Sequence, residues 1–584
     1  MPAHLLAIAV GPVQEFIAAA RRTRDLWFGS FLLSEVSKAT AKAVRSAGGK
    51  LIFPNPNTAT DLESESELNV ANVILAELPA GIDAREVAGK AKDAAKKRWE
   101  SFANEAHHEA SGVIRPEIWA DQVGDVVEFS AAWSPLGDDY RASRARVMRL
   151  LAGRKNCRDF LAARGRPGVP KSSLDGLRES VLKDPAVERW PQRFRARLRV
   201  REGEQLDVVG LTKRVAGGTQ PYPSVSRVAA DPWLRGHGGR LGPLIAACQQ
   251  LGNQVIRRLN TDAGHPHFAD FPFEGTAVFR NRHHELVEET ELAEGALLPL
   301  ADAVSKLGGE PNPYLAVIVA DGDNMGSTIS KLLSPEEHRR FSSKLAQFAV
   351  EAGKIVNEHR GVLVYAGGDD VLAFAPVDKC LKCARALHEK FGTLLAELVE
   401  ELNAKRPPID HLLSNMTLSV GVAIGHFMEN LEDLREYGKA AEKHAKQPDE
   451  NGVKDALAVH LHKRGGGPIR VRARWTDNPD GRIQEDAHLL LTQAIPSRLP
   501  YNLSRMADVY DGWPPTSVAV AIRRDVLRLI AAKAGDRAQL NRVAETVRAR
   551  VNDAASLREF AAELLIARQI ATACRQAGEG RDSR

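Results

Sequence analysis

Cysteine is scarce in this 584-residue chain, which has five cysteines, at positions 157, 248, 380, 383 and 574. Such few and scattered thiols exclude a disulfide-stapled scaffold and favour a reducing compartment, so we expect a cytoplasmic protein. Cys380 and Cys383 form one C-x-x-C pair. Because a structural zinc needs four ligands and the sequence has no second pair, we predict that both cysteines pack in the core and that no zinc is bound.

Long apolar runs are also missing. No stretch reaches the roughly eighteen apolar residues that a membrane-spanning helix needs, so we expect no membrane span. The N-terminus shows no basic segment followed by an apolar core and a cleavage site, which argues against secretion. Net charge is only +5, and the content of 43% hydrophobic and 27% charged residues is ordinary for a globular protein. The length predicts three or four domains.

Positive charge is unevenly distributed, because Lys and Arg clearly outnumber Asp and Glu between residues 141 and 214. A basic face of this kind can neutralise the phosphates of a nucleic acid. A solvated surface on an arginine-rich chain explains the same excess. Composition does not decide between the two interpretations.

The most informative stretch is GGDD at residues 367–370, which lies between short apolar runs at 362–366 and 371–375. Those runs favour strands, and the glycine pair favours a tight hairpin with Gly-Gly at its centre. The two carboxylates then emerge at the hairpin tip. Because side chains alternate along a strand, we predict that Asp369 and Asp370 point to opposite faces, so that only one of them easily faces a given site.

A second acidic turn, DGDNMG at 321–326, follows the apolar strand expected over 314–320. Between the two acidic turns lies one long helical pattern, roughly 335–359. A strand–helix–hairpin order brings the hairpin beside the first strand, so both acidic turns should meet at one edge of a sheet. Patterns further along, up to residue 461, complete a ferredoxin-like β-α-β-β-α-β order with a late extra helix and strand, which is the layout of nucleotide-polymerising Palm domains.

These residues suit the joining of nucleotides, in which a hydroxyl attacks an α-phosphate and pyrophosphate leaves. Two divalent ions about 3.5–4 Å apart can activate the attacking group and stabilise the leaving oxygens. Mg²⁺ prefers hard oxygen ligands, so we expect two Mg²⁺ or Mn²⁺ ions and a nucleoside triphosphate as substrate. The expected metal ligands are Asp321, Gly322, Asp369 and Asp370, and the three aspartates are the expected catalytic residues. An ordinary glycine hairpin with solvated aspartates is the competing interpretation, which the second acidic turn weakens.

Several groups near the two turns are candidates for holding the nucleotide. Glycines let the backbone approach a triphosphate closely. Lys439, Lys443 and Lys446 share one face of a predicted helix, although a solvated lysine stripe explains the same spacing. The candidate substrate-binding residues in this half of the chain are Asp323, Asn324, Gly367, Gly368, Lys443 and Lys446.

The N-terminal region repeats a β-α-β-β-α order but lacks the acidic turns. GPVQ at 11–14 and NPN at 55–57 stand where the acids of a catalytic Palm would be. We therefore predict a second Palm that holds no metal and seats the acceptor nucleotide, because joining two nucleotides requires donor and acceptor to face each other. Its candidate contacts are Gly11, Gln14, Arg24 and Ser30. A local ion pair between Arg24 and Asp25 is the alternative role for that arginine.

Three stretches carry a resemblance to a known family, namely AVGPVQEFIAAARRTRDLWFGSFLLSEV at 9–36, VADGDNMG at 319–326 and YAGGDDVLAFAPV at 365–377. In this order they resemble the large Palm-bearing subunit of type III CRISPR effector complexes, most closely the Cmr type of subtype III-B. Residues 206–233 are similar to that family too. The resemblance covers roughly residues 1–465, and the remainder is much less distinctive.

The resemblance implies an activity and a set of partners. The family polymerises ATP into cyclic oligoadenylate when its complex holds a target RNA, so CRISPR RNA, target RNA and the other subunits of a Cmr-type complex are the expected partners. By position, Asp321 and Asp369 match the metal-binding acids, and Asp370 matches the second acid of the family's GGDD. Lys446 stands where related cyclases place a phosphate-binding lysine.

Two features common in the family are missing from the sequence. Many relatives begin with a His-Asp nuclease domain, whereas this chain contains no His-Asp dipeptide, so we expect no site for cutting DNA. Relatives also often hold a zinc ion through four cysteines in the helical domain. Residues 170–181, in the corresponding region, contain no cysteine, so we expect apolar packing in its place.

The predicted fold class is α+β and multidomain, with two ferredoxin-like, nucleotidyl-cyclase-like Palm domains and additional helical domains. The expected division is a degenerate N-terminal Palm with a helical extension at 1–164, a mostly helical middle domain at 165–305, the catalytic Palm at 306–468 and a C-terminal helical bundle at 469–584. Two other functions remain open. One is a stand-alone diguanylate-cyclase-like enzyme, which normally carries Glu at the position of Asp370, and the other is a catalytically silent scaffold subunit of the RNA–protein complex.

Overall fold

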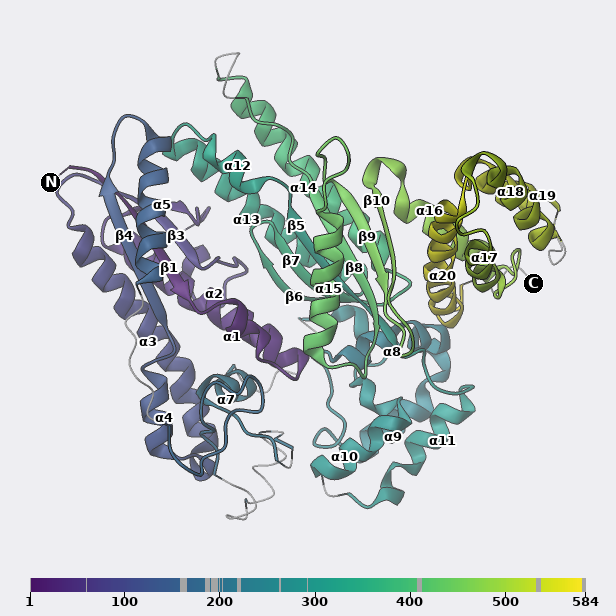
Figure 1. Cartoon of the computed structure of the whole chain (residues 1–584). Coiled ribbons are helices and arrows are strands. Elements are labelled where there is room, and N and C mark those ends of the chain that lie inside the picture. Colours follow the sequence, from purple (N-terminus) through teal and green to yellow (C-terminus); the bar gives the residue numbers. More distant parts are fainter. Residues whose placement is uncertain are drawn as a thin grey trace.

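Two β-sheets, each covered by helices, form the centre of the molecule, with further helices beside and behind them (Figure 1). The computed structural model describes residues 2–58, 60–157, 165–183, 190, 198, 200–201, 203–217, 222–261, 264–290, 292–406, 412–531 and 537–579. The fold is of the α+β class that the sequence predicts. Among the described residues, every helix is too short or too polar to cross a lipid bilayer.

The first sheet has the strand order β2-β3-β1-β4 with antiparallel neighbours, which is the ferredoxin-like order expected of a Palm. Its strands are β1 (His4–Gly11), β2 (Lys50–Phe53), β3 (Val73–Leu78) and β4 (Glu128–Pro135). The sequence pattern predicts the first three and misses β4, whose sequence EFSAAWSP contains no β-branched residue.

Helices cover both faces of the first sheet because side chains of β1 alternate between two apolar cores. Leu6 and the other even-numbered residues pack against α2 (Thr23–Ser46) and α3 (Ala84–Ala110). Leu5 and the other odd-numbered residues pack against α5 (Tyr140–Asn156). The short helices of this region are α1 (Gln14–Ala18) and α4 (Pro116–Val123).

The predicted domain boundary after residue 164 differs from the packing. Helix α7 (Val208–Val215) buries Val208 and Leu211 in the same apolar core as α2 and α3. The described residues up to about 216 therefore pack with the first Palm, and the separate helical layer begins at α8 (Val225–His237). Residues 158–164, at the predicted boundary itself, lie outside the described residues.

The second sheet has the strand order β10-β9-β8-β5-β7-β6, and only β8 and β9 are parallel neighbours. Its strands are β5 (Tyr314–Gly322), β6 (Val362–Gly367), β7 (Asp370–Ala375), β8 (Leu418–His426), β9 (Ala456–Leu461) and β10 (Ile469–Arg474). The predicted β-α-β-β-α-β order with a late helix and strand is confirmed. The boundary at 468 is corrected, because β10 pairs with β9 and residues 462–468 connect two strands of one hairpin.

The second sheet is also covered on both faces. Even-numbered residues of β5, such as Ile318, pack against α13 (Pro335–Glu358) and α14 (Cys380–Asn403). Odd-numbered residues, such as Val317, belong to the core that holds α15 (Leu431–Ala445) and the helices of the middle layer. Cys380 and Cys383 are buried in the α14 core, which confirms their predicted packing role.

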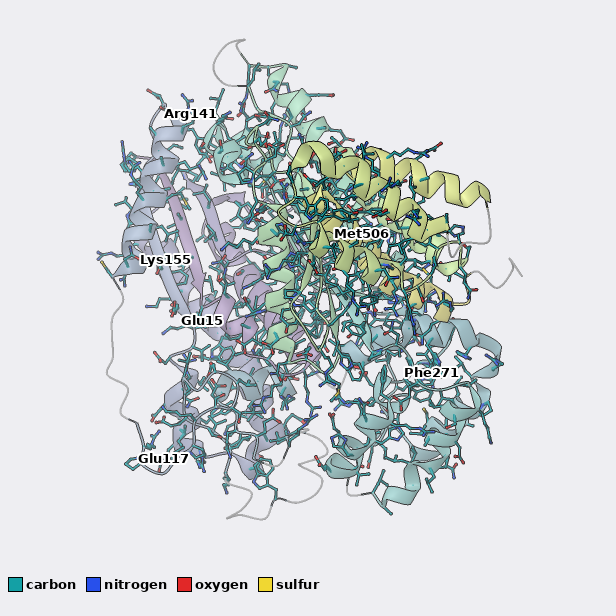
Figure 2. The ribbon with its side chains drawn as sticks, turned by 45° about the vertical axis from the view of Figure 1, so that its right-hand side comes forward. Glu15, Glu117, Arg141, Lys155, Phe271 and Met506 are labelled. Atoms are coloured by element: carbon teal, nitrogen blue, oxygen red, sulfur yellow. The ribbon has the colours of Figure 1, made fainter. Side chains whose placement is uncertain are left out.

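Helical layers flank the two Palms. The middle layer contains α8, α9 (Gly242–Leu251), α10 (His283–Thr290) and α11 (Leu298–Lys306). The C-terminal bundle contains α16 (Pro479–Leu491), α17 (Leu499–Val509), α18 (Pro515–Ala531), α19 (Arg537–Arg550) and α20 (Ala554–Gln576). In Figure 2, Lys155 marks the N-terminal Palm, Phe271 the middle layer and Met506 the bundle.

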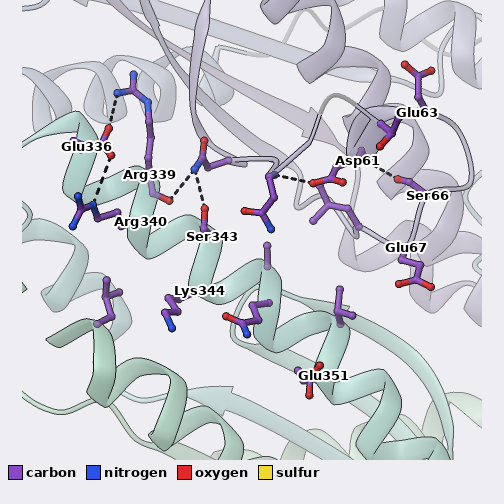
Figure 3. A pocket seen from close by; sticks show the side chains of 18 of the residues that line it. Asp61, Glu63, Ser66, Glu67, Glu336, Arg339, Arg340, Ser343, Lys344 and Glu351 are labelled. Atoms are coloured by element: carbon purple, nitrogen blue, oxygen red, sulfur yellow. Dashed lines mark hydrogen bonds and ion pairs between the residues drawn. The ribbon is translucent and has the colours of Figure 1, made fainter. Parts of the chain in front are cut away.

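The two Palms dock through β2, the loop that follows it and helix α13, where a cleft of about 1050 Å³ opens between them (Figure 3). Arg339 of α13 donates to the carbonyl oxygen of Leu51 at 3.0 Å and to Glu77 at 2.9 Å. Asn55 donates its backbone N–H to Ser342 at 2.9 Å and its side-chain amide to Ser343 at 2.8 Å. The NPN stretch, where a catalytic Palm would carry its acids, therefore binds the partner Palm.

Candidate functional site

Three carboxylates converge where the two acidic turns meet. Asp321 lies near the end of β5, Asp369 lies in the β6–β7 turn, and Asp370 begins β7. One ligand oxygen from each carboxylate lies within 4.8 Å of the others, and among the described residues this is the only group of three or more acids, histidines or cysteines so arranged. The meeting of the two turns at one sheet edge follows the sequence prediction.

The prediction that Asp369 and Asp370 face opposite ways is wrong, and the hairpin register explains why. Gly367 pairs with Asp370, so the two-residue loop is Gly368-Asp369 and not Gly-Gly. Gly368 has a φ of 76°, which side chains rarely tolerate and which suits the first position of a tight hairpin loop. Strand alternation does not apply to Asp369, because it belongs to the turn, and its carboxylate can join that of Asp370.

Close backbone approach and a bulge shape the site further. A Cβ on Gly322 would come within 2.9 Å of the Asp369 Cβ, so only glycine lets the two turns meet this closely. The β6–β7 register shifts between Leu363 and Tyr365, which marks a bulge next to the site. Beyond the bulge, Tyr365 pairs with Leu372, and both line the cavity beside Asp370.

Crowding makes the carboxylates poor at holding negative charge in the absence of a cation. Burial, followed by the charge of Asp370, raises the pKa of Asp369 to about 7. Desolvation by the surrounding protein raises the pKa of Asp370 to about 6. Burial also raises the pKa of Glu442 of α15, which the charge of Asp370 raises further. Such a cluster favours either protons or a bound cation.

Lys446, directly after α15, supplies one cation already present in the chain. Its ammonium donates to the carbonyl oxygen of Gly322 at 3.1 Å and contacts the carboxylate of Asp321. It therefore engages two of the four predicted metal ligands. Lys439 and Lys443 line the same cavity, as expected for residues on one helix face.

Two of the three carboxylates, those of Asp321 and Asp370, line a cavity of about 1630 Å³ that both Palms enclose. The second Palm contributes Asp321, Asp370 and the α15 face. The first Palm contributes Gly11 and Gln14, which the sequence analysis names as acceptor contacts. Part of the basic segment 141–214 lies outside the described residues, but its Arg154, Lys155 and Arg178 line this cavity.

Asp323 and Asn324 were predicted to contact the substrate, but the structure places both outside the cavity. Asp323 is 2% exposed, and its carboxylate accepts hydrogen bonds from Thr417 and Ser419, each at 2.8 Å, and from the backbone N–H of Asp455 at 3.2 Å. These hydrogen bonds connect the turn after β5 to β8 and to the residue before β9, so the Asp323 carboxylate does not face the cavity. Asn324 is exposed and precedes α12 (Met325–Ser330) in a left-handed conformation with a φ of 58°. Neither residue lines the cavity.

Arg24 and Ser30 were predicted as acceptor contacts, but the structure places them elsewhere. Both are buried in α2. Arg24 donates to the carbonyl oxygens of Lys213 at 3.2 Å and Ala216 at 2.9 Å, which satisfies the C-terminal carbonyls of α7. Asp25 accepts from Arg214 at 2.8 Å. This stretch joins α2 to α7 and contributes no lining to the cavity.

Several cavity residues escaped the sequence analysis, and four of them are polar or charged groups that can act on a nucleotide. Tyr365 lies beside the triad, and burial and the charges of Asp370 and Asp369 raise the pKa of its phenol, which keeps it a hydrogen-bond donor. Glu442 lies one turn before Lys446 on α15. Lys92 and Lys96 of α3 reach the cavity from the first Palm. The i, i+4 spacing of Lys92 and Lys96 on one face of α3 was the sequence signal that could have identified these two lysines.

The donor set fits Mg²⁺ or Mn²⁺. Three carboxylates and the Gly322 carbonyl are hard oxygen ligands, and their mutual repulsion is what a divalent cation relieves. No sulfur or imidazole ligand belongs to the cluster, which disfavours a zinc centre at this position.

Two family models match the chain. The model for the second palm domain of Cas10/Cmr2 matches residues 314–458. The model for the N-terminal part of the CRISPR-associated protein Cmr2 matches residues 5–104. The two matches fall within the two Palms, in the order that the structure shows.

Individual relatives agree with this assignment. The CRISPR system Cmr subunit Cmr2 of Pyrococcus furiosus is 24% identical over 621 aligned positions, which cover 90% of this chain and 69% of that protein. The Cmr2 subunit of Saccharolobus solfataricus is 35% identical over 61 residues, which cover 10% of this chain and 6% of that protein.

Solved structures share the fold. A type III-B Cmr-beta structure in the apo state matches with a TM-score of 0.61 at 12% identity, covering 92% of this chain and 78% of that chain. The Cmr-beta structure bound to cognate target RNA matches with a TM-score of 0.61 at 13% identity, covering 92% and 79% of the two chains. With a match in each Palm and the GGDD hairpin in place, the chain carries the N-terminal region of Cmr2 and the second palm domain of the Cas10/Cmr2 family of CRISPR-associated proteins.

Proposed function

We propose that the chain is the large subunit of an RNA-guided type III-B ribonucleoprotein and polymerises ATP into cyclic oligoadenylate when target RNA is bound. One observation carries the proposal: three carboxylates lie within 4.8 Å of one another, and two of them line a cavity that a second Palm, without the acidic turns, helps to enclose. A single triad provides one reacting centre, and the opposite wall provides room for a second nucleotide. CRISPR RNA and other Cmr subunits are the proposed partners.

Each residue has a distinct proposed role. Asp321, Asp369, Asp370 and the Gly322 carbonyl would hold two divalent ions, which would activate the attacking hydroxyl and stabilise the leaving pyrophosphate. Lys446 leaves the Asp321 carboxylate and pairs with the triphosphate when the ions are bound, because two cations cannot share one ligand favourably. Tyr365 donates a hydrogen bond beside the reacting phosphate.

The first Palm seats the acceptor nucleotide. Gly11 ends β1 and offers close backbone approach, and Gln14 begins α1 and offers a side-chain amide for a ribose or base. Lys92 and Lys96 line the part of the cavity that the first Palm forms and provide positive charge for the acceptor's phosphates. Holding both reactants in one cavity supplies the orientation that the joining reaction needs.

The direct test is synthesis by the Asp369→Ala variant in the assembled complex with labelled ATP. Losing one of three clustered carboxylates should reduce product by about a hundredfold or more, because the missing charge stabilised the metal-bound reacting groups. Asp138→Ala, in an exposed loop, is the matched control and should retain full activity. Near-normal synthesis by Asp369→Ala would refute the assignment.

The scaffold alternative has one observation in its favour, the contact of Lys446 with Asp321, which neutralises a metal ligand without any metal. Mn²⁺ titration of the purified chain separates the two functions. Tight Mn²⁺ binding that Asp369→Ala abolishes supports the synthase, whereas a chain that binds no Mn²⁺ and makes no product is a scaffold. Labelled GTP in the same assay tests the diguanylate-cyclase alternative, which the Asp at position 370 disfavours.

A further inference from the structure

The β6–β7 hairpin carries two of the three clustered carboxylates, yet its own sheet restrains it weakly. β6 is the edge strand, so in the described part of the chain β7 is its only strand neighbour. The bulge between Leu363 and Tyr365 interrupts even that pairing. A bulge leaves one residue of the strand unpaired and disrupts the ladder locally. Groups outside the sheet must therefore help to set the position of the hairpin tip.

The first such group is Asp231, which binds the chain just before β6. Arg360, two residues before the strand, has a left-handed backbone with a φ of 61°. Its guanidinium donates to both oxygens of Asp231, Nε to Oδ2 and Nη2 to Oδ1, each at 2.9 Å. Asp231 belongs to α8 of the middle layer and is 0% exposed. This bidentate geometry is the most specific form of an arginine–carboxylate pair.

The same carboxylate reaches the chain just after β7. Arg235, one turn along α8, donates to Oδ2 of Asp231 at 2.8 Å and to Oδ2 of Asp378 at 2.6 Å. Asp378 lies three residues beyond the end of β7. Arg227 completes the cluster at 3.4 Å from Asp231. Although burial alone raises the pKa of Asp231, hydrogen bonds from Arg360 and the surrounding arginine charges hold it below its usual value. The chain before β6 thus binds the charged Asp231 carboxylate directly, and the chain after β7 is linked to it through Arg235.

A third contact lies at the bulge itself. The hydroxyl of Tyr222 donates to the carbonyl oxygen of Leu363 in β6. The Tyr222 ring stacks on Trp27 of α2 with ring centroids 5.0 Å apart. The edge strand is therefore tied at its bulge to a residue that packs on the first Palm, in addition to the two ends tied to α8.

We propose that Asp231 is a positioning residue for the metal triad, acting with Tyr222 to fix the hairpin that carries Asp369 and Asp370. The six residues of β6 carry this restraint over about 20 Å from the buried carboxylate to the hairpin tip. The rate-related part of this inference rests on the proposed function, whereas its metal-binding part stands without it. In this way helix α8 of the middle layer helps to fix the position of the turn that carries Asp369.

The first experiment compares Mn²⁺ affinity and ATP kinetics of Asp231→Asn with the wild-type chain. Loss of the carboxylate charge releases both ends of the hairpin, so Mn²⁺ affinity should fall by about tenfold, within the range of energetic coupling between linked sites. The turnover number should fall while KM for ATP stays near its wild-type value, because the α15 lysines do not move. Glu563→Gln is the matched control, since Glu563 is also 0% exposed and paired with two arginines, Arg482 and Arg550, in the C-terminal bundle.

A gentler variant decides the matter if Asp231→Asn fails to fold. Tyr222→Phe removes only the hydroxyl that donates to Leu363, and Tyr510→Phe, which removes a hydroxyl bonded to Asp525 in the bundle, is its control. Weaker Mn²⁺ binding by Tyr222→Phe but not by Tyr510→Phe supports the proposal. Unchanged Mn²⁺ affinity in Tyr222→Phe and in any folded Asp231→Asn overturns it. A wild-type chain that binds Mn²⁺ without making product would defeat the proposed function and leave this test intact.

Discussion

At the scale of single residues, Asp369 links protonation to stability. Its pKa of about 7 lies well above the usual value for an aspartate, so folding favours its neutral form. A raised carboxyl pKa contributes stability that is fully present below the unfolded pKa and is lost as pH rises through the folded pKa. In metal-free protein, the wild type should therefore lose on the order of 2–4 kcal/mol relative to Asp369→Asn between pH 5 and pH 8.

Denaturant unfolding of both proteins in EDTA at the two pH values measures this difference. Mg²⁺ or Mn²⁺ should restore wild-type stability at pH 8 and have little effect on Asp369→Asn, because the variant lacks the repulsion that a cation relieves. Parallel pH profiles for the two proteins would show that Asp369 is not held in its neutral form.

Lys446 gives a second prediction at this scale. The Lys446 ammonium contacts Asp321 and, in the proposed function, pairs with the triphosphate when ATP is bound. Lys446→Ala should therefore weaken ATP binding by about tenfold in the presence of Mg²⁺. Lys331→Ala, at the end of α12, is the control and should leave binding unchanged. Nucleotide titration by calorimetry reports both affinities, and equal effects would instead favour a solvated lysine stripe.

At the scale of elements, the hairpin loop depends on a backbone conformation. Gly368 has a φ of 76°, so Gly368→Ala should destabilise the chain by about 1–2 kcal/mol and displace Asp369. Gly81→Ala is the matched control, because Gly81 has a φ of 90° and open space around the missing Cβ but lies far from the triad. Both variants should lose similar stability in denaturant, and only Gly368→Ala should lose Mn²⁺ affinity. Full Mn²⁺ binding by Gly368→Ala would show that the loop conformation does not position Asp369.

At the scale of the whole molecule, the cavity between the Palms predicts the number of bound nucleotides. Two molecules of a non-hydrolysable ATP analogue should bind per chain, because each Palm offers one wall of a cavity of about 1630 Å³. Chelating the metal should weaken one of the two sites, and Lys92→Glu combined with Lys96→Glu should weaken the other. A stoichiometry of one, unaffected by the lysine changes, would remove the acceptor role of the first Palm.

The described part of the chain also bears on DNA cleavage. The triad is its only cluster of metal-ligand type, so purified protein with Mn²⁺ should not cut single-stranded DNA under conditions where it makes oligonucleotides. Gel analysis of a labelled single strand tests this expectation. Cleavage that survives Asp369→Ala and Asp370→Ala together would reveal a second metal site.

Short-range patterns in the sequence by themselves determined much of this protein. The β-α-β-β-α-β order, the two acidic turns, the lysine face and the C-terminal helices follow from hydrophobic periodicity and turn residues, which act within a few positions along the chain. The same reasoning missed β4 and β10, because EFSAAWSP lacks β-branched residues and IRVRAR follows a glycine-rich loop that reads as a linker.

Only the tertiary structure decided how those pieces act together. A one-residue difference in hairpin register turned Asp369 toward Asp370, and long-range partners took Arg24 and Asp323 out of the cavity and into buried hydrogen bonds. The buried carboxylate of Asp231 and its three arginines come from segments more than a hundred residues apart, namely α8 and the loop before β6. Such contacts depend on which surfaces pack together, and burial strengthens electrostatic interactions that the linear pattern cannot reveal.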